Sequence, residues 1–346
     1  MRNPFKEEEL DSEMTHSSWT PAELLKISSS YWLSSALHAG VGLDVFTPLE
    51  ERPRRAEELA AELKLSERGL SMLLDALVAL ELVEKSAQTY RNSVFSKTYL
   101  CRNSPHYLGH IIRHHHHLMG SWFRLEEAVR SGKPVRNRLS HEGIEQERES
   151  FLMGMFNLGM QMAPKIATQL NLEGRTRLLD LGGGPGTYAI HFCQKYPQLQ
   201  ATIFDLETTR SFAEKTVAQF NLQDRIDFTA GDFQHSPIPG RYDVAWLSHV
   251  LHGEGRSGCL NMLAATFEAL EPEGQVLIQE FILEDSRDQP LFPALFSLNM
   301  LLGTPEGQAY SDQEIREMLT HAGFVDIEPL IVDLPNSAGV ISAKRP

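Results

Sequence analysis

The chain has 346 residues, of which 42% are hydrophobic and 23% are charged, and these ordinary globular values exclude a fibrous or wholly disordered chain. Its 32 Lys and Arg residues against 46 Asp and Glu residues give a net charge of −14, which argues against a protein that holds nucleic-acid backbones through basic side chains. No stretch approaches the roughly eighteen uninterrupted apolar residues of a membrane span, and the three cysteines form no closely spaced metal or redox pair. We therefore expect a cytoplasmic protein of about two domains that has no membrane partner.

The first hundred residues predict a small helical domain. Residues 1–20 are acidic and polar, so we expect a loosely ordered leader and no signal peptide. Over 21–104, Pro21 opens a helix, a second helix covers 56–63, and Ser66 caps a third helix with leucines at helical spacing. A small hairpin follows, and this order is typical of a winged-helix domain that is otherwise all-helical.

A winged helix raises the alternative of DNA binding. The helix that would enter the groove, with its exit, carries Glu67, Asp75, Glu81 and Glu84 against one cation, Arg68. A recognition helix should present cations and amides to the bases, so DNA would repel this one. We therefore predict no nucleic-acid partner and interpret the domain as a dimerisation module.

Residues 105–165 are predicted to form a helical linker that lines the substrate cleft. On a helix, His110, His114 and His117 would share one face at a spacing that suits a metal ion. The alternative is a polar helix flank beside the cleft, and we favour it because no carboxylate or cysteine joins these histidines in the sequence. The sequence thus predicts no metal site, and leaves open a contact between the histidines and a substrate.

From residue 166 to 346 the pattern alternates between strands and helices, which predicts a Rossmann-like, doubly wound α/β sheet. Five strands are expected before the end of the chain, over residues 177–181, 201–205, 226–229, 242–248 and 275–281. Residues 324–332 and 339–343 then follow each other without room for a helix, which predicts a terminal antiparallel hairpin added to a parallel sheet.

A glycine-rich turn follows the first of these strands. Asp180 ends the strand, Gly182, Gly184 and Gly186 follow, and a helix begins near Thr187. Glycines let a ligand approach the backbone, and the free amides of the helix N-terminus favour an anion. A dinucleotide-binding loop needs a further glycine at Thr187, and its pyrophosphate would be repelled by Asp180. The ammonium of a methionine group would be attracted by it, so we predict S-adenosyl-L-methionine as the cofactor.

Two more acidic residues follow later strands of the predicted sheet. Asp205 ends the second strand, where it can accept hydrogen bonds from ribose hydroxyls. Asp232 and Phe233 follow the third strand, where they offer an acceptor for the adenine amino group and an aromatic wall. Asp180, Gly182, Gly184, Asp205, Asp232 and Phe233 therefore form the predicted cofactor site.

Together with residues 247–252, these motifs resemble class I S-adenosylmethionine-dependent O-methyltransferases with an N-terminal winged-helix dimerisation domain, as in plant caffeate and bacterial natural-product enzymes. The resemblance covers nearly the whole chain after the leader. It implies that His252 is the general base and that Glu280 orients it, and it adds Leu206 and Ser248 to the cofactor contacts. It also implies an acceptor pocket at four positions, which are Met160, Phe296, Asn299 and Met300.

The sequence departs from this family pattern near the base. Gly253 and Glu254 follow His252 where Asp-Trp is common, and Ala309 occupies the position of a second catalytic Glu in the plant enzymes. The departures at residues 253, 254 and 309 put the orientation of the base in doubt, although Glu306 could serve after a local shift. Ser248 also replaces a lysine of the plant enzymes, which puts the transfer of their cofactor contacts in doubt. His249 is interpreted as a packing or cofactor-side residue.

The resemblance implies a homodimeric, metal-independent enzyme that methylates a hydroxyl of an aromatic or polycyclic small molecule. Two alternatives stay open. The same fold and cofactor could serve methylation of nitrogen or carbon, or a reaction without methyl transfer. A ligand-sensing winged-helix regulator is the alternative from another class, and it would need the DNA binding that the acidic helix argues against.

Overall fold

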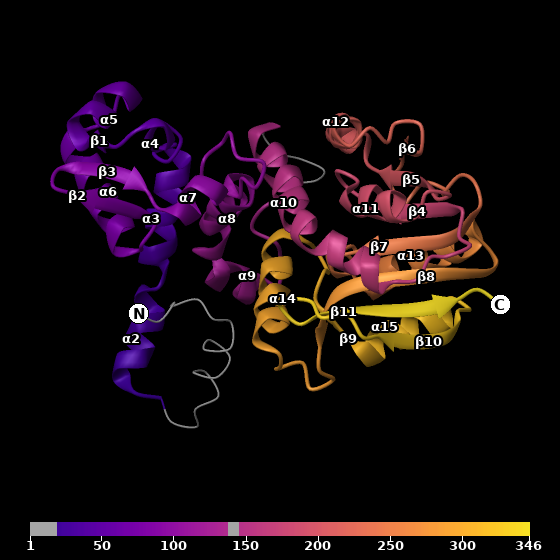
Figure 1. Ribbon diagram of the computed structural model, residues 1–346. Helices are drawn as coiled ribbons and strands as arrows, with labels where there is room; N and C mark the ends of the chain where they lie inside the picture. The colour runs from indigo at the N-terminus through magenta and orange to yellow at the C-terminus, as the bar shows by residue number, and fades with distance from the viewer. Residues whose placement is uncertain (1–18, 138–144) are drawn as a thin grey trace. The chain divides into compact units, whose positions relative to one another are not determined.

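A computed structural model describes residues 19–137 and 145–346 of the chain (Figure 1). It forms two compact units, which divide between Pro105 and His106. The second unit contains both the helical segment that follows residue 105 and the large sheet.

The N-terminal unit is built from short helices around a three-stranded sheet. Its helices are α2 (Pro21–Ser29), α3 (Tyr31–Gly42), α4 (Pro48–Glu51), α5 (Ala56–Leu63), α6 (Glu67–Ala79) and α7 (Val94–Tyr99). Its strands are β1 (Arg54–Arg55), β2 (Val83–Ser86) and β3 (Thr89–Asn92), in the order β1-β3-β2. The sequence predicted the hairpin β2–β3 but not β1, because a strand of two residues has no periodic pattern.

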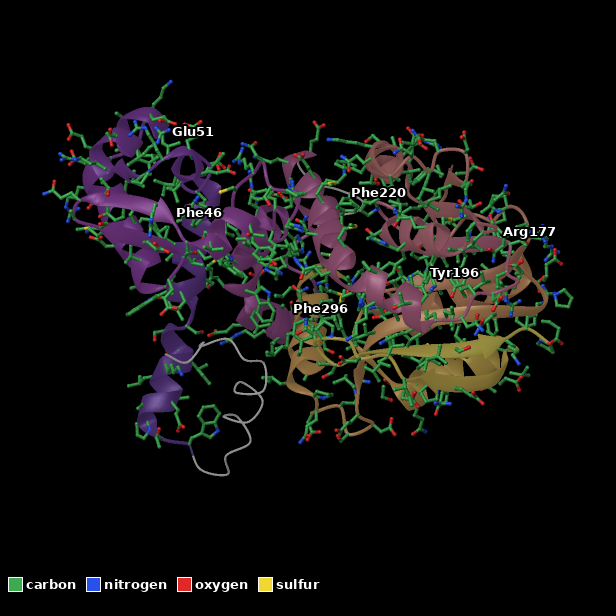
Figure 2. All side chains as sticks on the ribbon, viewed as in Figure 1. Phe46, Glu51, Arg177, Tyr196, Phe220 and Phe296 are labelled. Atoms are coloured by element: carbon green, nitrogen blue, oxygen red, sulfur yellow. The ribbon has the colours of Figure 1, made fainter. Side chains whose placement is uncertain are left out.

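Local sequence explains where these helices start. Thr20 and Glu23 form a reciprocal capping box ahead of Pro21, and the Ser66 hydroxyl accepts a hydrogen bond from the Gly69 amide at the start of α6. Leucines on the inner face of α6 pack into a core that includes the fully buried Phe46, labelled in Figure 2.

The outer face of α2 and α3 remains apolar and exposed. α2 buries none of its residues, and Trp32 on α3 is 65% exposed. Apolar side chains of α3, α6 and the residue that follows α6 line an open groove on this unit, and they are Trp32, Leu33, Ala36, Ala76, Ala79 and Leu80.

The second unit begins with three helices, α8 (Gly109–Trp122), α9 (Leu125–Ser131) and α10 (Glu145–Gln169). The long helix α10 packs against both α8 and the first helix of the sheet region, α11 (Thr187–Lys195). None of the described helices is long and apolar enough to cross a membrane.

A mixed sheet forms the centre of this unit, with the strand order β10-β11-β8-β7-β4-β5-β6. The strands are β4 (Arg177–Leu181), β5 (Gln200–Asp205), β6 (Ile226–Ala230), β7 (Tyr242–Ser248), β8 (Leu270–Leu283), β10 (Val325–Leu330) and β11 (Ala338–Lys344), and the short β9 (Tyr310–Ser311) pairs with β8. β4 to β8 are parallel, whereas β10 and β11 form an antiparallel hairpin on β8. The predicted doubly wound sheet and terminal hairpin are thus confirmed.

Helices cover both faces of the sheet because both faces of its strands are apolar. Along β4, Leu178 points into a core with α11 and α12 (Arg210–Gln219), and Leu179 points into a core with α13 (Arg256–Ala269) and α15 (Asp312–His321). Val244 and Ala245 of β7 repeat this alternation. The two cores hold the carboxyl ends of the strands in fixed positions.

The chain changes direction across the sheet between β4 and β7. It builds β5 and β6 on one side of β4 and then crosses to build β7 and β8 on the other side. Ligands of open α/β sheets bind in the crevice at such a switch point, outside the carboxyl ends of the strands. The loops that follow β4 and β7 meet there, and α14 (Leu291–Gly303) contacts the short 3-10 helix that follows β7.

Candidate active site

The glycine-rich loop after β4 needs its glycines for two physical reasons. Gly182, Gly184 and Gly186 have φ values of +65°, +55° and +78°, a region that side-chain-bearing residues adopt only with strain. A Cβ atom on Gly182 would also lie 2.5 Å from Cγ1 of Val250, which follows β7. At Gly182 the loop therefore packs closely on the segment that follows β7. A Cβ on Gly184, in contrast, would meet no atom within 4 Å.

Asp180 lies beneath this loop and is only 1% exposed. Its Oδ2 accepts a hydrogen bond from the Ala189 amide at 3.2 Å, and its Oδ1 has no partner. Burial raises the pKa of Asp180 to about 7, with the nearby charge of Asp205 adding to the effect and the Ala189 amide opposing it. An unpaired, buried carboxylate oxygen suits a cation such as the ammonium of S-adenosylmethionine.

Asp205 is the last residue of β5 and Asp232 lies two residues after β6, so each of three adjacent strands has an aspartate at or near its carboxyl end. Asp205 accepts hydrogen bonds from the amides of Gly184 and Leu206, both at 2.7 Å, which ties the glycine loop to the end of β5. Asp232 accepts from the Gln234 amide at 2.9 Å. The ring of the next residue, Phe233, comes within 3.9 Å of a Cβ placed on Gly182. The predicted cofactor residues of these strands therefore surround one loop.

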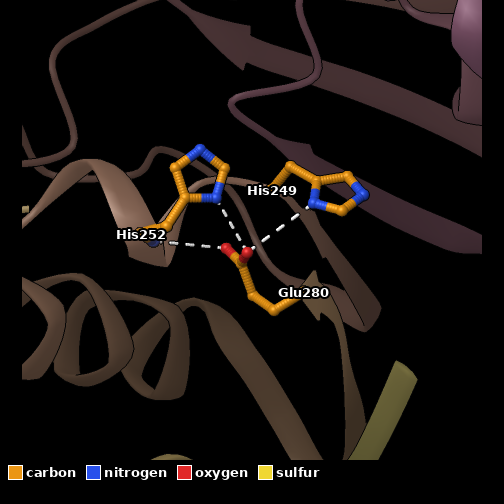
Figure 3. A group of neighbouring side chains, drawn as sticks. All are labelled: His249, His252 and Glu280. Atoms are coloured by element: carbon orange, nitrogen blue, oxygen red, sulfur yellow. Dashed lines mark hydrogen bonds and ion pairs between the residues drawn. The ribbon is translucent and has the colours of Figure 1, made fainter. Parts of the chain in front are cut away.

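The turn after β7 has an unusual backbone. His249 has a φ of +55°, which is uncommon for a histidine, and its amide donates to the carbonyl of Gln279 on β8 at 2.8 Å. Ser248 donates from Oγ to Oε1 of Gln279 at 3.0 Å. The chain then enters the 3-10 helix η2 (Leu251–Gly253). This turn places His249 and His252 on the two sides of Glu280, as Figure 3 shows.

Glu280 is 2% exposed, and its carboxylate contacts both the backbone amides of this turn and the His252 ring. Its Oε2 lies 2.8 Å from Nδ1 of His252, and its Oε1 accepts from the amides of Leu251 at 2.8 Å and His252 at 3.3 Å. Burial alone would raise the pKa of Glu280, but the interactions with His252 and His249 hold it well below its ordinary value. Glu280 is therefore a carboxylate that fixes both the backbone and the ring of His252, whose Nε2 points away from it (Figure 3).

His249 is the residue whose position the sequence analysis missed. Its Nδ1 lies 3.6 Å from Oε2 of Glu280, so both histidines approach the same carboxylate oxygen. The ligand atoms of His249, His252 and Glu280 lie within 4.8 Å of one another, which a metal ion could use. The 2.8 Å spacing between His252 and Glu280 is that of a hydrogen bond, so these residues also suit a base and its orienting acceptor. The only sequence signal was the i, i+3 spacing of the histidines.

Aromatic rings enclose the two histidines. The Phe296 ring on α14 lies edge-on to His252 with centroids 4.8 Å apart, and Phe281 lies 4.3 Å from the His249 ring. Phe292 and Phe296 are stacked at 6.0 Å and both contact Phe281. These rings offer an apolar wall for a flat aromatic ligand beside His252.

The departures from the family pattern leave Glu280 as the carboxylate that contacts His252 within the described parts of the chain. Ala309 is fully buried, at 0% exposure, and offers no polar group. The Glu306 carboxylate lies against Gly255, where an added Cβ would come within 2.3 Å of Oε2. Glu306 therefore faces the backbone of the loop that leads into α13.

The other predicted acceptor residues have specific contacts. The Met160 sulfur lies 3.3 Å from Nε2 of His191 on α11. Asn299 accepts from the Arg136 guanidinium, and Met300 is 8% exposed in the interior of α14. Among the four predicted acceptor residues, all of which lie in the described part of the chain, Phe296 is the one whose ring packs against His252.

The histidine run lies on α8, where His114 is buried beside Phe151, with ring centroids 5.3 Å apart. Burial lowers the pKa of His114 to about 3, and the charges of His115 and Arg136 contribute less. His114 is therefore neutral near pH 7. A grouping of ligands around a possible metal position was found only at His249, His252 and Glu280 within residues 19–137 and 145–346.

A doubly wound sheet with three strand-end aspartates around a glycine loop, beside a buried histidine–glutamate pair, defines the class of S-adenosylmethionine-dependent α/β methyltransferases. Sequence comparison identifies the family within this class. Residues 122–325 match the O-methyltransferase domain and residues 25–102 match the O-methyltransferase dimerisation domain. The chain belongs to the O-methyltransferase family that these two domains define.

Similar proteins cover nearly the whole chain. It is 31% identical to the 3-hydroxy-5-methyl-1-naphthoate 3-O-methyltransferase of Streptomyces sahachiroi, over 94% of this chain and 95% of the relative. It is 33% identical to the tetracenomycin polyketide synthesis 8-O-methyl transferase of Streptomyces glaucescens, over 92% and 96%. The structure of human N-acetylserotonin methyltransferase in complex with S-adenosylmethionine is similar with a TM-score of 0.82 and 29% identity, over 96% and 99%. The protein is an S-adenosylmethionine-dependent O-methyltransferase.

Proposed function

We propose that this enzyme methylates a hydroxyl on an aromatic, bicyclic or polycyclic acceptor, with His252 as the general base. One observation carries the proposal. A buried carboxylate, Glu280, lies 2.8 Å from Nδ1 of a histidine at the switch point of the sheet and leaves the other ring nitrogen pointing away from it (Figure 3).

The cofactor residues fit S-adenosylmethionine through the unpaired Oδ1 of Asp180 and the open space above Gly184. Asp180 would hold the ammonium, Asp205 the ribose hydroxyls, and Asp232 with Phe233 the adenine, with Gly182, Leu206 and Ser248 close by. When bound, the cofactor supplies a methyl group on a positively charged sulfur. An aspartate at each of three adjacent strand ends favours a ligand with a positive charge and several donors.

His252 would remove the proton that the acceptor must lose. A phenol has a pKa of about 10, so a base raises the fraction of phenolate near neutral pH. The hydrogen bond to Glu280 holds the ring in the tautomer that carries its proton on Nδ1, which leaves Nε2 free to accept. The negative charge of Glu280 then stabilises the imidazolium that forms.

The aromatic character of the acceptor is supported by the rings around His252 and by the names of the two bacterial relatives, which refer to a hydroxynaphthoate and to tetracenomycin polyketide synthesis. We propose that the acceptor packs against Phe296, with Met160, Asn299 and Met300 lining the remainder of its pocket. Phe281 and Phe292 both pack against Phe296.

We further propose that the enzyme is a homodimer formed by its N-terminal unit. The match to the dimerisation domain and the exposed apolar face of α2 and α3 support this assembly. Nucleic acid is not among the proposed partners, because α6 carries Glu67 and Asp75 where a recognition helix needs cations.

A methyl-transfer assay tests the proposed reaction. The purified enzyme is incubated with S-adenosylmethionine and 1-naphthol, 2-naphthol or the isosteric naphthylamines, and S-adenosylhomocysteine and product are identified by mass spectrometry. We expect O-methyl ethers from at least one naphthol and no N-methyl product. Transfer to the amines alone would support the alternative of N-methylation and overturn the proposal.

A further inference from the structure

Arg136 is fixed at the end of α14, although it precedes this helix by more than a hundred and fifty residues. The amides of Val135 and Arg136 both donate to the carbonyl of Leu302, at 3.0 and 3.1 Å. A Cβ on Gly303 would come within 2.4 Å of Cζ of Arg136, so only a glycine leaves room for the guanidinium in this position. The guanidinium of Arg136 therefore packs closely against the backbone at the end of α14.

The guanidinium of the half-buried Arg136 has few hydrogen-bond partners. Its Nη2 donates to the carbonyl of Asn299 at 3.3 Å and lies 3.5 Å from the Asn299 side-chain oxygen, Oδ1. Its Nε is buried and has no hydrogen-bond partner, and Arg136 forms no ion pair with a described residue. Polar groups held away from water are normally paired, so the buried, unpartnered Nε of this cation suits an anionic ligand.

Stabilisation of the α14 C-terminus explains only part of this arrangement. A cation at a helix C-terminus interacts favourably with the partial negative charge of the last carbonyls. Such a cap uses one or two of the five guanidinium N–H groups and needs no burial. Burial disfavours the charged form and lowers the pKa of Arg136, although arginine stays protonated at neutral pH. A full negative charge at this position would offset that cost.

The position of Arg136 relative to His252 suits a flat acceptor. Phe296 contacts His252, and Asn299, which contacts Arg136, lies three residues further along α14 and hence on the same face. Three residues of helix advance by about 4.5 Å, which is close to the width of a fused ring system. On α8, the buried, neutral His114 also has an Nδ1 without a hydrogen-bond partner. His114 lies close enough to Arg136 for the positive charge of Arg136 to lower its pKa.

We propose that Arg136, with the Asn299 side chain, binds an anionic group on the acceptor, so that the acceptor is a hydroxylated aromatic carboxylate. This inference rests on the proposed function, since it places the hydroxyl at His252. The planar guanidinium fork matches a carboxylate, and its charge selects acidic acceptors over neutral aromatic compounds of the same shape.

Binding to ligands without a hydroxyl tests the inference without methyl transfer. Isothermal titration of the full-length enzyme with S-adenosylhomocysteine bound compares 1-naphthoate with neutral 1-naphthamide. We expect naphthoate to bind at least about tenfold more tightly. Arg136→Gln should weaken naphthoate binding by about ten- to a hundredfold and change naphthamide binding by less than about twofold.

Two further variants separate charge recognition from a structural role. Arg136→Lys keeps the charge but loses the fork, so its naphthoate affinity should lie between those of the wild type and Arg136→Gln. Arg130→Gln on α9, where the side chain is 81% exposed, should change neither affinity. If the wild type shows no preference for naphthoate, or if a folded Arg136→Gln weakens both ligands equally, the inference is wrong. The wild-type comparison decides the question even if Arg136→Gln does not fold.

The hydroxylated pair, 3-hydroxy-1-naphthoate and its amide, separates this inference from the proposed reaction. Tight, Arg136-dependent binding of the acid without methyl transfer would uphold the anion site and overturn the proposed function. Methyl transfer at equal kcat/KM to the acid and the amide would uphold the reaction and overturn the anion site.

Discussion

Glu280 organises the turn after β7, because its carboxylate accepts hydrogen bonds from both the backbone and the side chains of this turn. One carboxylate oxygen accepts two amides of the η2 turn, and the other approaches both His252 and His249. A carboxylate provides about four acceptor positions, so this arrangement uses nearly all of them. The buried negative charge of Glu280 is therefore stabilised by these donors. In turn, it would stabilise the imidazolium that forms on His252 when His252 takes up the acceptor proton.

We predict that Glu280→Gln lowers kcat by about ten- to a thousandfold while the affinity for S-adenosylhomocysteine stays within about threefold. Glutamine keeps the shape and can accept a hydrogen bond, but it lacks the charge that stabilises protonated His252. Steady-state kinetics and titration calorimetry measure the two quantities, with the exposed Glu268→Gln as a control. Unchanged turnover in Glu280→Gln would show that the charge has no catalytic role.

Asp180 should make cofactor binding depend on pH. Its pKa of about 7 in the free enzyme lies above its ordinary value of 3.8, so the carboxyl is largely protonated at pH 6. An ammonium favours the ionised form, so binding should release a proton below pH 7, and affinity should increase as the pH rises from 6 to 8. Calorimetry of S-adenosylhomocysteine binding in buffers of different ionisation enthalpy measures that proton.

Asp180→Asn should bind the same ligand more weakly at pH 8 and with little dependence on pH over this range. Proton release that is as large in Asp180→Asn as in the wild type would assign the titration to another group.

The same pKa predicts how the stability of the free enzyme depends on pH. The folded state binds more protons than the unfolded state between about pH 4 and 7, so the contribution of Asp180 to stability falls as the pH rises through that window.

At the scale of elements, the glycine loop needs glycine for its positive φ values and for the space that a missing side chain leaves. Two glycines of this chain allow these two requirements to be tested separately. Gly184 and Gly174 both have positive φ values, of +55° and +81°, and a Cβ on either would meet no atom within 4 Å. Only Gly184 lies in the loop, where its amide donates to Asp205. Alanine at either position carries the same kind of backbone strain, of about 1 kcal/mol.

We predict that Gly184→Ala and Gly174→Ala lower the free energy of unfolding by similar amounts, about 1 kcal/mol, and that only Gly184→Ala weakens cofactor binding, by about tenfold or more. The added methyl group would project into the open space above the loop, which we assign to the cofactor. Denaturant unfolding and ligand titration test the pair. Equal cofactor affinities in the two variants would place the ligand elsewhere.

The sequence predicts the elements well because their patterns are local. The parallel strands, the glycine turn and the terminal hairpin each have a clear signal, and β4 and β7 have the predicted bounds. The sequence gives no signal for contacts that depend on pairing between distant segments. The approach of His249 to Glu280 depends on the register of β7 with β8 and on one left-handed residue. The contact of Arg136 with Asn299 joins an irregular segment to a helix far along the chain, which no periodicity reports.

At the scale of the whole molecule, the proposed dimer would cover apolar surface that the single chain leaves exposed. Trp32 is 65% exposed and Leu33 is 59% exposed, and both line the groove between α3 and α6. Contiguous exposed apolar surface of this kind is typical of interaction sites. We predict that the double variant Trp32→Glu/Leu33→Glu is monomeric, because an interface would have to bury two unpaired charges.

Light scattering coupled to size-exclusion chromatography measures the oligomeric state. Val94→Glu is a suitable control, since Val94 is 81% exposed on α7 in the same unit. We expect a dimer for the wild type and for Val94→Glu. A monomeric wild type, or a double variant that remains dimeric, would contradict assembly through this face.

The central claim is that His252 removes the acceptor proton, and the effect of its removal on turnover tests it most directly. With the naphthol that gives the highest turnover, His252→Ala should reduce kcat by about a hundredfold or more, while the affinity for S-adenosylhomocysteine stays within about threefold. His321→Ala, at an exposed position on α15, should behave as the wild type. If His252→Ala retains wild-type kcat, His252 is not the base.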